Sequence, residues 1–280
     1  MAHNRKPKTT RPTVGPPSTL VFFHAHPDDE AIGTAGTMAL AAAGGNRVVL
    51  VVATRGEEGE VDDGFLDHGE TLEDRRVAET LAAAEILGVD RIEFLGYRDS
   101  GMMGEPSNDN PSCFWRADLE EAAARLARIL DQEAADVLTV YDDHGGYGHP
   151  DHIQVHRVGH RAADLAGTPR VYEATMNRDR ISRMRSGLRH AAGDDEGDTD
   201  AIYDTIGTPD GEISTAVDVT TVLDKKRAAM MAHPSQIQAD SWFFRLAPDA
   251  FSEAFGTEWY VRTRPPFEGA IPQDRDDRLV

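Results

Sequence analysis

The sequence predicts an α/β fold, in which a Rossmann-like, mostly parallel sheet is flanked by helices and carries a smaller C-terminal appendage. Short apolar runs of strand length occur at 20–23, 48–53, 92–95 and 137–141. Segments with apolar residues at helical spacing separate these runs, and such alternation is typical of a parallel sheet. The first runs are rich in Val, Leu and Phe, which favours strands that are covered on both faces.

Length and composition suit one large domain. The chain has 280 residues, of which 40% are hydrophobic, enough for a sizeable core. The 29 Lys and Arg residues against 49 Asp and Glu residues give a formal net charge of −20. A phosphate backbone would be repelled, so we expect no nucleic acid partner. The single cysteine, Cys113, excludes an intramolecular disulfide and a cysteine-based zinc finger.

The N-terminal segment is basic but lacks the apolar stretch of a signal peptide, and no apolar run is long enough to span a bilayer. We therefore expect a cytoplasmic protein with no membrane partner. Residues 1–18 are rich in Pro, Lys and Arg, so we expect a disordered tail there. Neither the composition nor the motifs decide between a monomer and a homo-oligomer.

The first strand, helix and strand follow one another near the N-terminus. The strand at 20–23 leads to an Ala-rich helix at 32–43, which a Gly-Gly-Asn sequence ends, and the second strand follows at 48–53. The polar segment after the second strand, TRGEEGEVDDG, starts on the same rim as the end of the first strand. We expect it to be a solvated loop.

The same pattern continues along the chain. Apolar spacing predicts helices over 71–87 and 119–130, each followed by one of the remaining apolar runs. A helix beginning at Pro150 comes next, and a fifth strand is expected at 171–174.

These elements predict a domain plan. We expect residues 19–175 to form the Rossmann-like catalytic core, residues 176–263 to form an insertion and a C-terminal part packed on the core by aromatic residues, and residues 264–280 to form a tail. Within the second stretch, 177–200 carries a basic run followed by an acidic run, which indicates a mobile insertion. No motif is visible over 177–214, so this region leaves the substrate specificity open.

The first cluster of chemically active residues stands where the strand at 20–23 ends, in the sequence HAHPDDE. The crevice outside the carboxyl ends of the strands is where α/β sheets bind ligands, so His26, Asp28, Asp29 and Glu30 arrive at a suitable place. Three carboxylates repel one another unless positive charge lies among them, and a divalent cation supplies it. The alternative is that the acids only cap the next helix.

A second cluster favours the metal. The loop after the strand at 137–141 reads DDHGGYGHPDH, and Pro150 suits the first turn of a helix. His149 and His152 therefore lie one turn apart at the mouth of that helix. His156 and His160 continue along the helix, where we expect a structural role, and we leave them out of the metal site.

A catalytic zinc takes three protein ligands of the His or carboxylate type and keeps a fourth position open. His26, Asp29 and His152 supply such a set. Asp28 then remains as general base.

The second cluster also supplies groups for the substrate. His149 could donate to the developing oxyanion or to the leaving amine, with Asp151 orienting its ring. Tyr147 could help to polarise the carbonyl group. Together these residues predict hydrolysis of an amide.

The motifs resemble those of the PIG-L/LmbE superfamily of zinc-dependent N-deacetylases, and most closely its mycothiol-pathway deacetylases and mycothiol S-conjugate amidases. The matching segments are HAHPDDE at 24–30, GEEGEV at 56–61, RDSGM at 98–102 and GGYGHPDH at 145–152. The resemblance covers residues 20–175, with a weaker match in AHPSQI at 232–237. It implies a Rossmann-like fold and removal of an N-acyl group, expected to be acetyl, from an amino sugar such as a GlcNAc-containing conjugate.

The resemblance also implies one metal ion per chain, zinc or alternatively Fe²⁺, held by the residues named above. It places Arg76 and Asp99 at the sugar. We add Arg98 as a further candidate substrate contact, because it stands beside Asp99 on the same rim. The alternative roles are structural: Arg76 could pair with Glu73 or Glu79 on its own helix, and Asp99 could only hold its turn.

Three other functions remain to be compared. An amidase that cleaves the cysteinyl-glucosamine amide of mycothiol S-conjugates would use the same residues. A dinucleotide-binding oxidoreductase is disfavoured because the acidic turn after the first strand would repel a pyrophosphate. A non-catalytic zinc-containing binding module would leave Asp28 and His149 without a role.

Overall fold

The computed structural model describes residues 17–192, 205–266 and 279, and in this part of the chain seven strands form one sheet. The strands are β1 Thr19–His24, β2 Arg47–Val52, β3 Arg91–Phe94, β4 Val137–Tyr141, β5 Arg170–Thr175, β6 Thr215–Asp218 and β7 Thr257–Arg264. Their order across the sheet is β3-β2-β1-β4-β5-β7-β6. The first five pair in parallel, and β7 runs antiparallel to both β5 and β6. The predicted α/β class with a mostly parallel sheet is confirmed.

The order of the strands positions the site. From β1 the chain builds β2 and β3 on one side and then returns to build β4 and β5 on the other. Residue Val21 of β1 accordingly pairs with Val49 of β2 and with Leu138 of β4. The strand order therefore reverses between β1 and β4, and their carboxyl ends flank a crevice of the kind in which open α/β sheets bind ligands.

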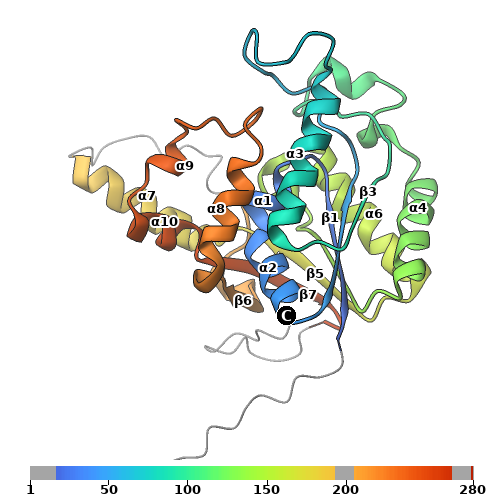
Figure 1. Cartoon of the computed structure of the whole chain (residues 1–280). Helices are drawn as coiled ribbons and strands as arrows, with labels where there is room; N and C mark the ends of the chain where they lie inside the picture. The colour runs from blue at the N-terminus through green and yellow to red at the C-terminus, as the bar shows by residue number, and fades with distance from the viewer. Residues whose placement is uncertain (1–16, 193–204, 267–278, 280) are drawn as a thin grey trace, which may run out of the picture.

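Helices cover both faces of the sheet (Figure 1). They are α1 Asp29–Gly33, α2 Ala35–Ala43, α3 Leu72–Leu87, α4 Leu119–Glu133, α5 Gly145–Gly148, α6 Pro150–Ala166, α7 Arg178–Ala192, α8 Leu223–Met231, α9 Trp242–Arg245 and α10 Pro248–Phe255, with short 3-10 turns η1 Pro106–Asp109, η2 Phe114–Arg116, η4 Asp210–Glu212 and η5 Thr220–Val222. Helices α2, α3 and α8 pack on one face, and α4 and α6 pack on the other. Within the described ranges, none of these helices has both the length and the apolarity that a membrane span requires.

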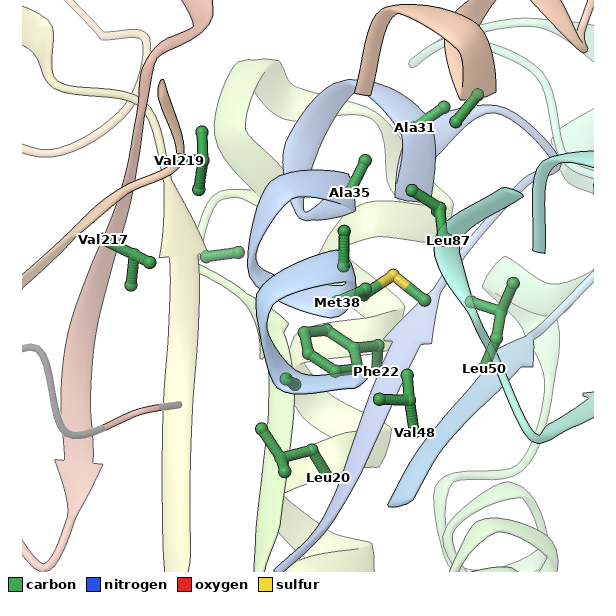
Figure 2. Packing of buried hydrophobic residues seen from close by; sticks show 14 of the residues in the cluster. Leu20, Phe22, Ala31, Ala35, Met38, Val48, Leu50, Leu87, Val217 and Val219 are labelled. Atoms are coloured by element: carbon green, nitrogen blue, oxygen red, sulfur yellow. The ribbon is translucent and has the colours of Figure 1, made fainter. Parts of the chain in front are cut away.

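The alternation of β1 divides the core into two layers. Phe22 faces the layer that holds α2 and α3, whereas Val21 and Phe23 face the layer that holds α4 and α6. Figure 2 shows Phe22 packed with Met38 of α2 and Leu87 of α3. Burial of each such side chain contributes about 1.5–3 kcal/mol, which fixes the strand in register below the site.

The predicted helix at 32–43 is interrupted in the structure. One short helix ends at Gly33 and the next begins at Ala35, because the intervening Thr34 leaves helical geometry, with a φ of −137°. The side chain of Thr34 hydrogen-bonds to His24 Nε2 at 2.8 Å. The break also frees backbone N–H groups of α2 for a distant carboxylate, which no local sequence pattern reveals.

The C-terminal part adds strands β6 and β7 to the sheet, in addition to the packing that we expected. The basic run expected as a mobile insertion is helical over Arg178–Ala192, where Asn177 Oδ1 accepts the Arg180 N–H at 3.0 Å as a helix cap. The acidic run at 193–200 lies outside the described residues. So do residues 1–16 of the tail expected at 1–18, and residues 267–278 and 280 of the tail expected at 264–280.

Glu258 on β7 joins the C-terminal part to the start of α2. Its buried carboxylate accepts the backbone N–H groups of Gly36 and Thr37, each at 2.8 Å. Lys226 of α8 donates to the same carboxylate at 2.6 Å, and both side chains are only 2% exposed. Negative charge at a helix N-terminus is favourable, and the buried lysine balances it.

We predict that Lys226→Met lowers the free energy of unfolding by about 3–5 kcal/mol, because it leaves the Glu258 carboxylate buried without its counter-charge. Chemical denaturation measures the change. Lys225→Met is the matched control, since Lys225 is exposed, and it should stay within about 0.5 kcal/mol of the parent protein. Equal stability of the two variants would contradict this account of the pair.

Candidate metal centre

Seven of the ten residues predicted for the site line a hollow of about 290 Å³ at the carboxyl ends of β1 and β4. Its lining includes Asp28, Arg76, Asp99, Tyr147 and His149. The hollow lies where the strand order reverses, as the α/β architecture leads one to expect.

The HPDD turn after β1 is held in an unusual conformation. Asp28 has a φ of 98°, in the left-handed region that residues other than glycine rarely adopt. Asp29 Oδ2 accepts the backbone N–H of His26 at 2.8 Å, and Glu30 Oε2 accepts that of Asp28 at 3.1 Å. Gln236 donates to the carbonyl oxygen of Pro27 at 2.6 Å. These contacts hold the two aspartates at the crevice.

Asp29 stands between two imidazoles. Its Oδ2 lies 3.4 Å from His26 Nδ1 and 3.4 Å from His152 Nε2. His152 Nδ1 faces the carbonyl oxygen of Gly145 at 3.3 Å, so we assign its proton to Nδ1. His152 Nε2 is then a buried lone pair, and it has no hydrogen-bond partner in the structure. A buried imidazole nitrogen of this kind is suited to a cation.

His26 is oriented in the same way by carboxylates. Its Nε2 lies 2.9 Å from Asp99 Oδ1 and 3.3 Å from Asp151 Oδ2, so Nε2 carries the proton and Nδ1 faces Asp29. Burial disfavours charge on His26, but these three carboxylates outweigh it and raise the pKa of His26 well above its ordinary value. The pocket therefore favours positive charge at this position.

The neighbouring aspartates have opposite pKa shifts. Burial raises the pKa of Asp28 well above its ordinary value, and the charge of Asp29 adds to the effect. Burial acts on Asp29 too, but His152 and His26 outweigh it and lower the pKa of Asp29 well below the ordinary range. Asp29 is thus the charged partner of the imidazoles, whereas Asp28 is suited to hold a proton.

These side chains fit a divalent metal ion. Two imidazole nitrogens and one carboxylate oxygen make the donor set of many catalytic zinc sites. His26, His149 and His152 also offer ligand atoms within 4.8 Å of one another. The distances alone therefore also allow His149 to be a metal ligand. The hydrogen bond that His149 makes indicates whether it is a ligand or a hydrogen-bond donor.

His149 is fixed by the backbone rather than by a carboxylate. The N–H of Asp151 donates to His149 Nδ1 at 3.1 Å, so the neutral ring carries its proton on Nε2. Burial, with His26 and His152 nearby, lowers the pKa of His149 to about 4. His149 is therefore a neutral hydrogen-bond donor near pH 7.

This arrangement differs from the expected role of Asp151. We expected its carboxylate to orient His149, but that carboxylate faces His26 and accepts Ser100 N–H at 2.9 Å and Ser100 Oγ–H at 2.5 Å. The backbone N–H takes the expected role because the residue sits in the first turn of α6, where N–H groups lack helical partners. Ser100 was missed, although it lies within the RDSGM motif.

Arg76 is buried under the GEEG loop. It donates to the carbonyl oxygen of Gly56, and a Cβ at Gly56 or Gly59 would overlap its guanidinium. Burial lowers the pKa of Arg76 from its ordinary value. The pairing with Glu79 that we considered is replaced by other contacts, since Glu79 binds the N–H and Oγ–H of Ser235. Arg76 thus lines the hollow with its charge available to a ligand.

Of the other residues predicted to contact the substrate, Asp99 and Tyr147 line the hollow and Arg98 does not. Asp99 lies at the hollow, where Oδ2 accepts the Glu58 N–H at 3.1 Å. Tyr147 lines the hollow with its ring 5.0 Å from that of His152. Arg98 is not brought there, because its half-exposed guanidinium points to Glu57 at 3.8 Å.

A contact between the C-terminal part and the turn after β1 was also not predicted. His233 Nε2 lies 2.6 Å from Glu30 Oε1, and both side chains are fully buried. The segment AHPSQI at 232–237 was the signal, since it contains His233 together with Ser235 and Gln236. These contacts join the segment to the HPDD turn after β1 and to α3.

Comparisons with known proteins agree with this geometry. A family model described as PIG-L, GlcNAc-PI de-N-acetylase, matches residues 21–163. A protein of Salinispora arenicola is 43% identical over 288 residues, covering 95% of this chain and 92% of the relative. One of Acidothermus cellulolyticus is 45% identical over 260 residues, covering 88% and 89%. Both relatives are named 1D-myo-inositol 2-acetamido-2-deoxy-alpha-D-glucopyranoside deacetylase.

Solved structures share the fold at lower identity. N,N'-diacetylchitobiose deacetylase from Pyrococcus horikoshii is 21% identical, with a TM-score of 0.59 over 92% of this chain and 88% of that chain. GalB, a 4-carboxy-2-hydroxymuconate hydratase from a Pseudomonas, is 22% identical, with a TM-score of 0.61 over 91% and 100%. A deacetylase and a hydratase thus share this fold, so the fold alone does not specify the reaction.

We predict that His152→Ala abolishes tight metal binding at this centre, because it removes the unpartnered Nε2. Asp151→Asn should weaken metal affinity about 10- to 100-fold, because it perturbs the orientation of His26. Competition of zinc with a chelator measures both, and circular dichroism checks folding. His68→Ala, at an exposed histidine, is the control and should bind as the parent does. Unchanged affinity in His152→Ala would refute the assignment.

Proposed function

The chain belongs to the PIG-L family, as its motifs predicted, and we propose that it is a metal-dependent N-deacetylase of a glucosaminyl-inositol conjugate. The relatives named for this activity match at 43% and 45% identity over most of both chains. The observation that carries the proposal is the placement of Asp28 and His149 beside the cluster of His26, Asp29 and His152. A metal-binding module without catalysis would need the cluster alone.

The reaction is hydrolysis of an acetamide. A divalent cation held by His26, Asp29 and His152 would polarise the amide carbonyl group and lower the pKa of a water molecule. We propose zinc for this position because its donors are imidazole and carboxylate; Fe²⁺ is the alternative, since it accepts the same donors.

Asp28 is the proposed base. Its carboxylate faces the hollow and takes a proton from the attacking water as the new C–O bond forms. Its raised pKa makes it a stronger base than an exposed aspartate. The same proton then moves to the leaving nitrogen as the C–N bond breaks, and acetate and the amine are released.

His149 is proposed to stabilise the negative charge on the carbonyl oxygen. Its Nε2–H is free to donate, since the Nδ1 is engaged by the Asp151 N–H. A neutral imidazole loses no proton in this role, which suits a pKa of about 4. Tyr147, at the edge of the hollow, could donate to the same oxygen.

The substrate is proposed to have two rings. Beside the first hollow lies a second, of about 340 Å³, which shares Arg76 and Gln236 with it. The second hollow is lined further by Glu60, Asp62 and Gln238. Carboxylates and amides form hydrogen bonds with hydroxyl groups, so a polyol such as inositol fits this hollow while the acetamido sugar occupies the first.

The proposal also covers the contacts to the sugar, the cellular location and the alternative substrates. Asp99 and Arg76 are proposed to bind sugar hydroxyl groups, and Arg98 has a weaker case because it does not line the hollow. The free, buried thiol of Cys113 is in keeping with a cytoplasmic location. Mycothiol S-conjugates remain the alternative substrates, and they are distinguished by assay.

We predict that Asp28→Asn lowers kcat about 10²- to 10⁴-fold while the bound metal is retained, because only the base is removed. Release of acetate from the N-acetylglucosaminyl-inositol conjugate and metal content per chain are the two readouts. Asp143→Asn is the matched control, because that side chain is 81% exposed. Full turnover by Asp28→Asn would exclude this mechanism, and inactivity of the parent on every acetylated amino sugar would exclude the function.

We predict that Gln238→Ala raises KM for the two-ring conjugate about three- to tenfold, the value of one lost hydrogen bond. KM for a methyl glycoside of N-acetylglucosamine should not change, because that substrate leaves the second hollow empty. Steady-state kinetics with both substrates, and with a cysteinyl-glucosamine conjugate, makes the comparison. An equal rise for both glycosides would contradict the placement of the second ring.

A further inference from the structure

A second group of metal-ligating side chains lies on the same helix as the catalytic histidines. His156 and His160 stand one and two turns beyond His152 on α6, and Glu173 faces them from β5. The function proposed above uses none of these three residues. Their sequence spacing alone suggested a structural role, but the carboxylate opposite them changes what the pair can do.

The three side chains converge on one point. His160 Nε2 lies 2.8 Å from Glu173 Oε1, and His156 Nδ1 lies 3.4 Å from the same oxygen. The imidazole rings are 4.5 Å apart, and the three ligand atoms lie within 4.8 Å of one another. Bonds of about 2.0–2.1 Å in a tetrahedral site place ligand atoms about 3.3 Å apart. The observed separations therefore need only side-chain adjustment to hold an ion.

Burial and charge favour a cation here. Glu173 shares its face of β5 with Val171, whose side chain is in the apolar layer beneath α6. The Glu173 side chain is only 13% exposed, and both ion pairs recorded for it in the described part of the chain are with histidines. A largely buried carboxylate needs hydrogen bonds or positive charge, and in this structure His160 is its hydrogen-bond partner at 2.8 Å. A neutral imidazole is also the form that binds metals.

We propose that His156, His160 and Glu173 form a second site for a divalent cation of the zinc class. Two histidines four residues apart on a helix with a carboxylate from a neighbouring element make a donor set that zinc accepts. The ion clamps α6 onto β5, and its fourth position is open to water because the histidines are partly exposed.

This site is separate from the catalytic one. Six residues along a helix correspond to about 9 Å, which is the rise from His152 to the middle of the new pair. Metal ions that act together in two-metal sites lie about 3.5–4 Å apart. The second ion therefore stabilises the fold and takes no part in the hydrolysis.

A structural connection between the two sites remains. His156 Nδ1 also lies 3.1 Å from the carbonyl oxygen of Tyr141, at the end of β4. The ring of Tyr141 stacks on that of His152, with centroids 4.4 Å apart. A metal ion bound at His156 Nδ1 would replace this hydrogen bond. The ion would then lie beside the end of β4, next to α6.

The test is a zinc titration of the metal-free full chain, read by metal content and by thermal unfolding. We expect two equivalents per chain in the parent protein and one in His160→Gln and Glu173→Gln. His68→Gln, which removes an exposed histidine, should still bind two. The zinc-dependent rise in Tm should be smaller in His160→Gln than in the parent, because one stabilising ion is lost.

Activity separates the two sites. His160→Gln should keep the deacetylase activity of the parent, since His160 does not line the hollow, whereas His152→Ala should lose it and keep the second equivalent. Equal zinc stoichiometry in the parent and His160→Gln would overturn the second site. The stoichiometry does not depend on turnover, so a failure of the proposed deacetylation would leave this result unaffected.

Discussion

The carboxylate of Asp29, placed between the imidazoles of His26 and His152, is the interaction on which the rest of the site depends. It joins the turn after β1 to the helix after β4 across the point where the strand order reverses. Acidic side chains gather there at a density that only positive charge can stabilise. The carboxylates of Asp99 and Asp151 orient the His26 ring so that Nδ1 faces Asp29, and the site thereby offers a cation both negative charge and lone pairs.

The backbone of Asp28 allows neighbouring carboxylates to act differently. Its φ of 98° lies in the left-handed region, and its side chain lines the hollow. Such conformations cost about 1–3 kcal/mol and persist where the surroundings hold them. Here the Glu30 carboxylate holds the N–H, and the Gln236 side chain holds the preceding carbonyl group. Asp28 and Asp29 are consecutive in the sequence, and this conformation lets one be the proposed base and the other a proposed metal ligand.

The parallel strands and the gathering of His26, Asp29 and His152 could be predicted because both depend on local patterns: apolar runs, and polar residues where those runs end. The remainder depends on contacts between distant residues. Glu258 lies 222 residues from Gly36, whose N–H it accepts, so the break between α1 and α2 had no local signal. Strands β6 and β7 pair antiparallel within the C-terminal part, so the pairing that adds them to the sheet depends on residues about 40 positions apart.

The contact between Glu30 and His233 has a consequence for the order in which the protein is made. The two residues are 203 positions apart. A ribosome adding about 5–20 residues per second needs about 10–40 s to cover that interval. Throughout that time the nascent chain carries the acidic turn after β1 without the buried imidazole that will face it, so this turn gains its His233 contact only after the segment at 232–237 has been synthesised.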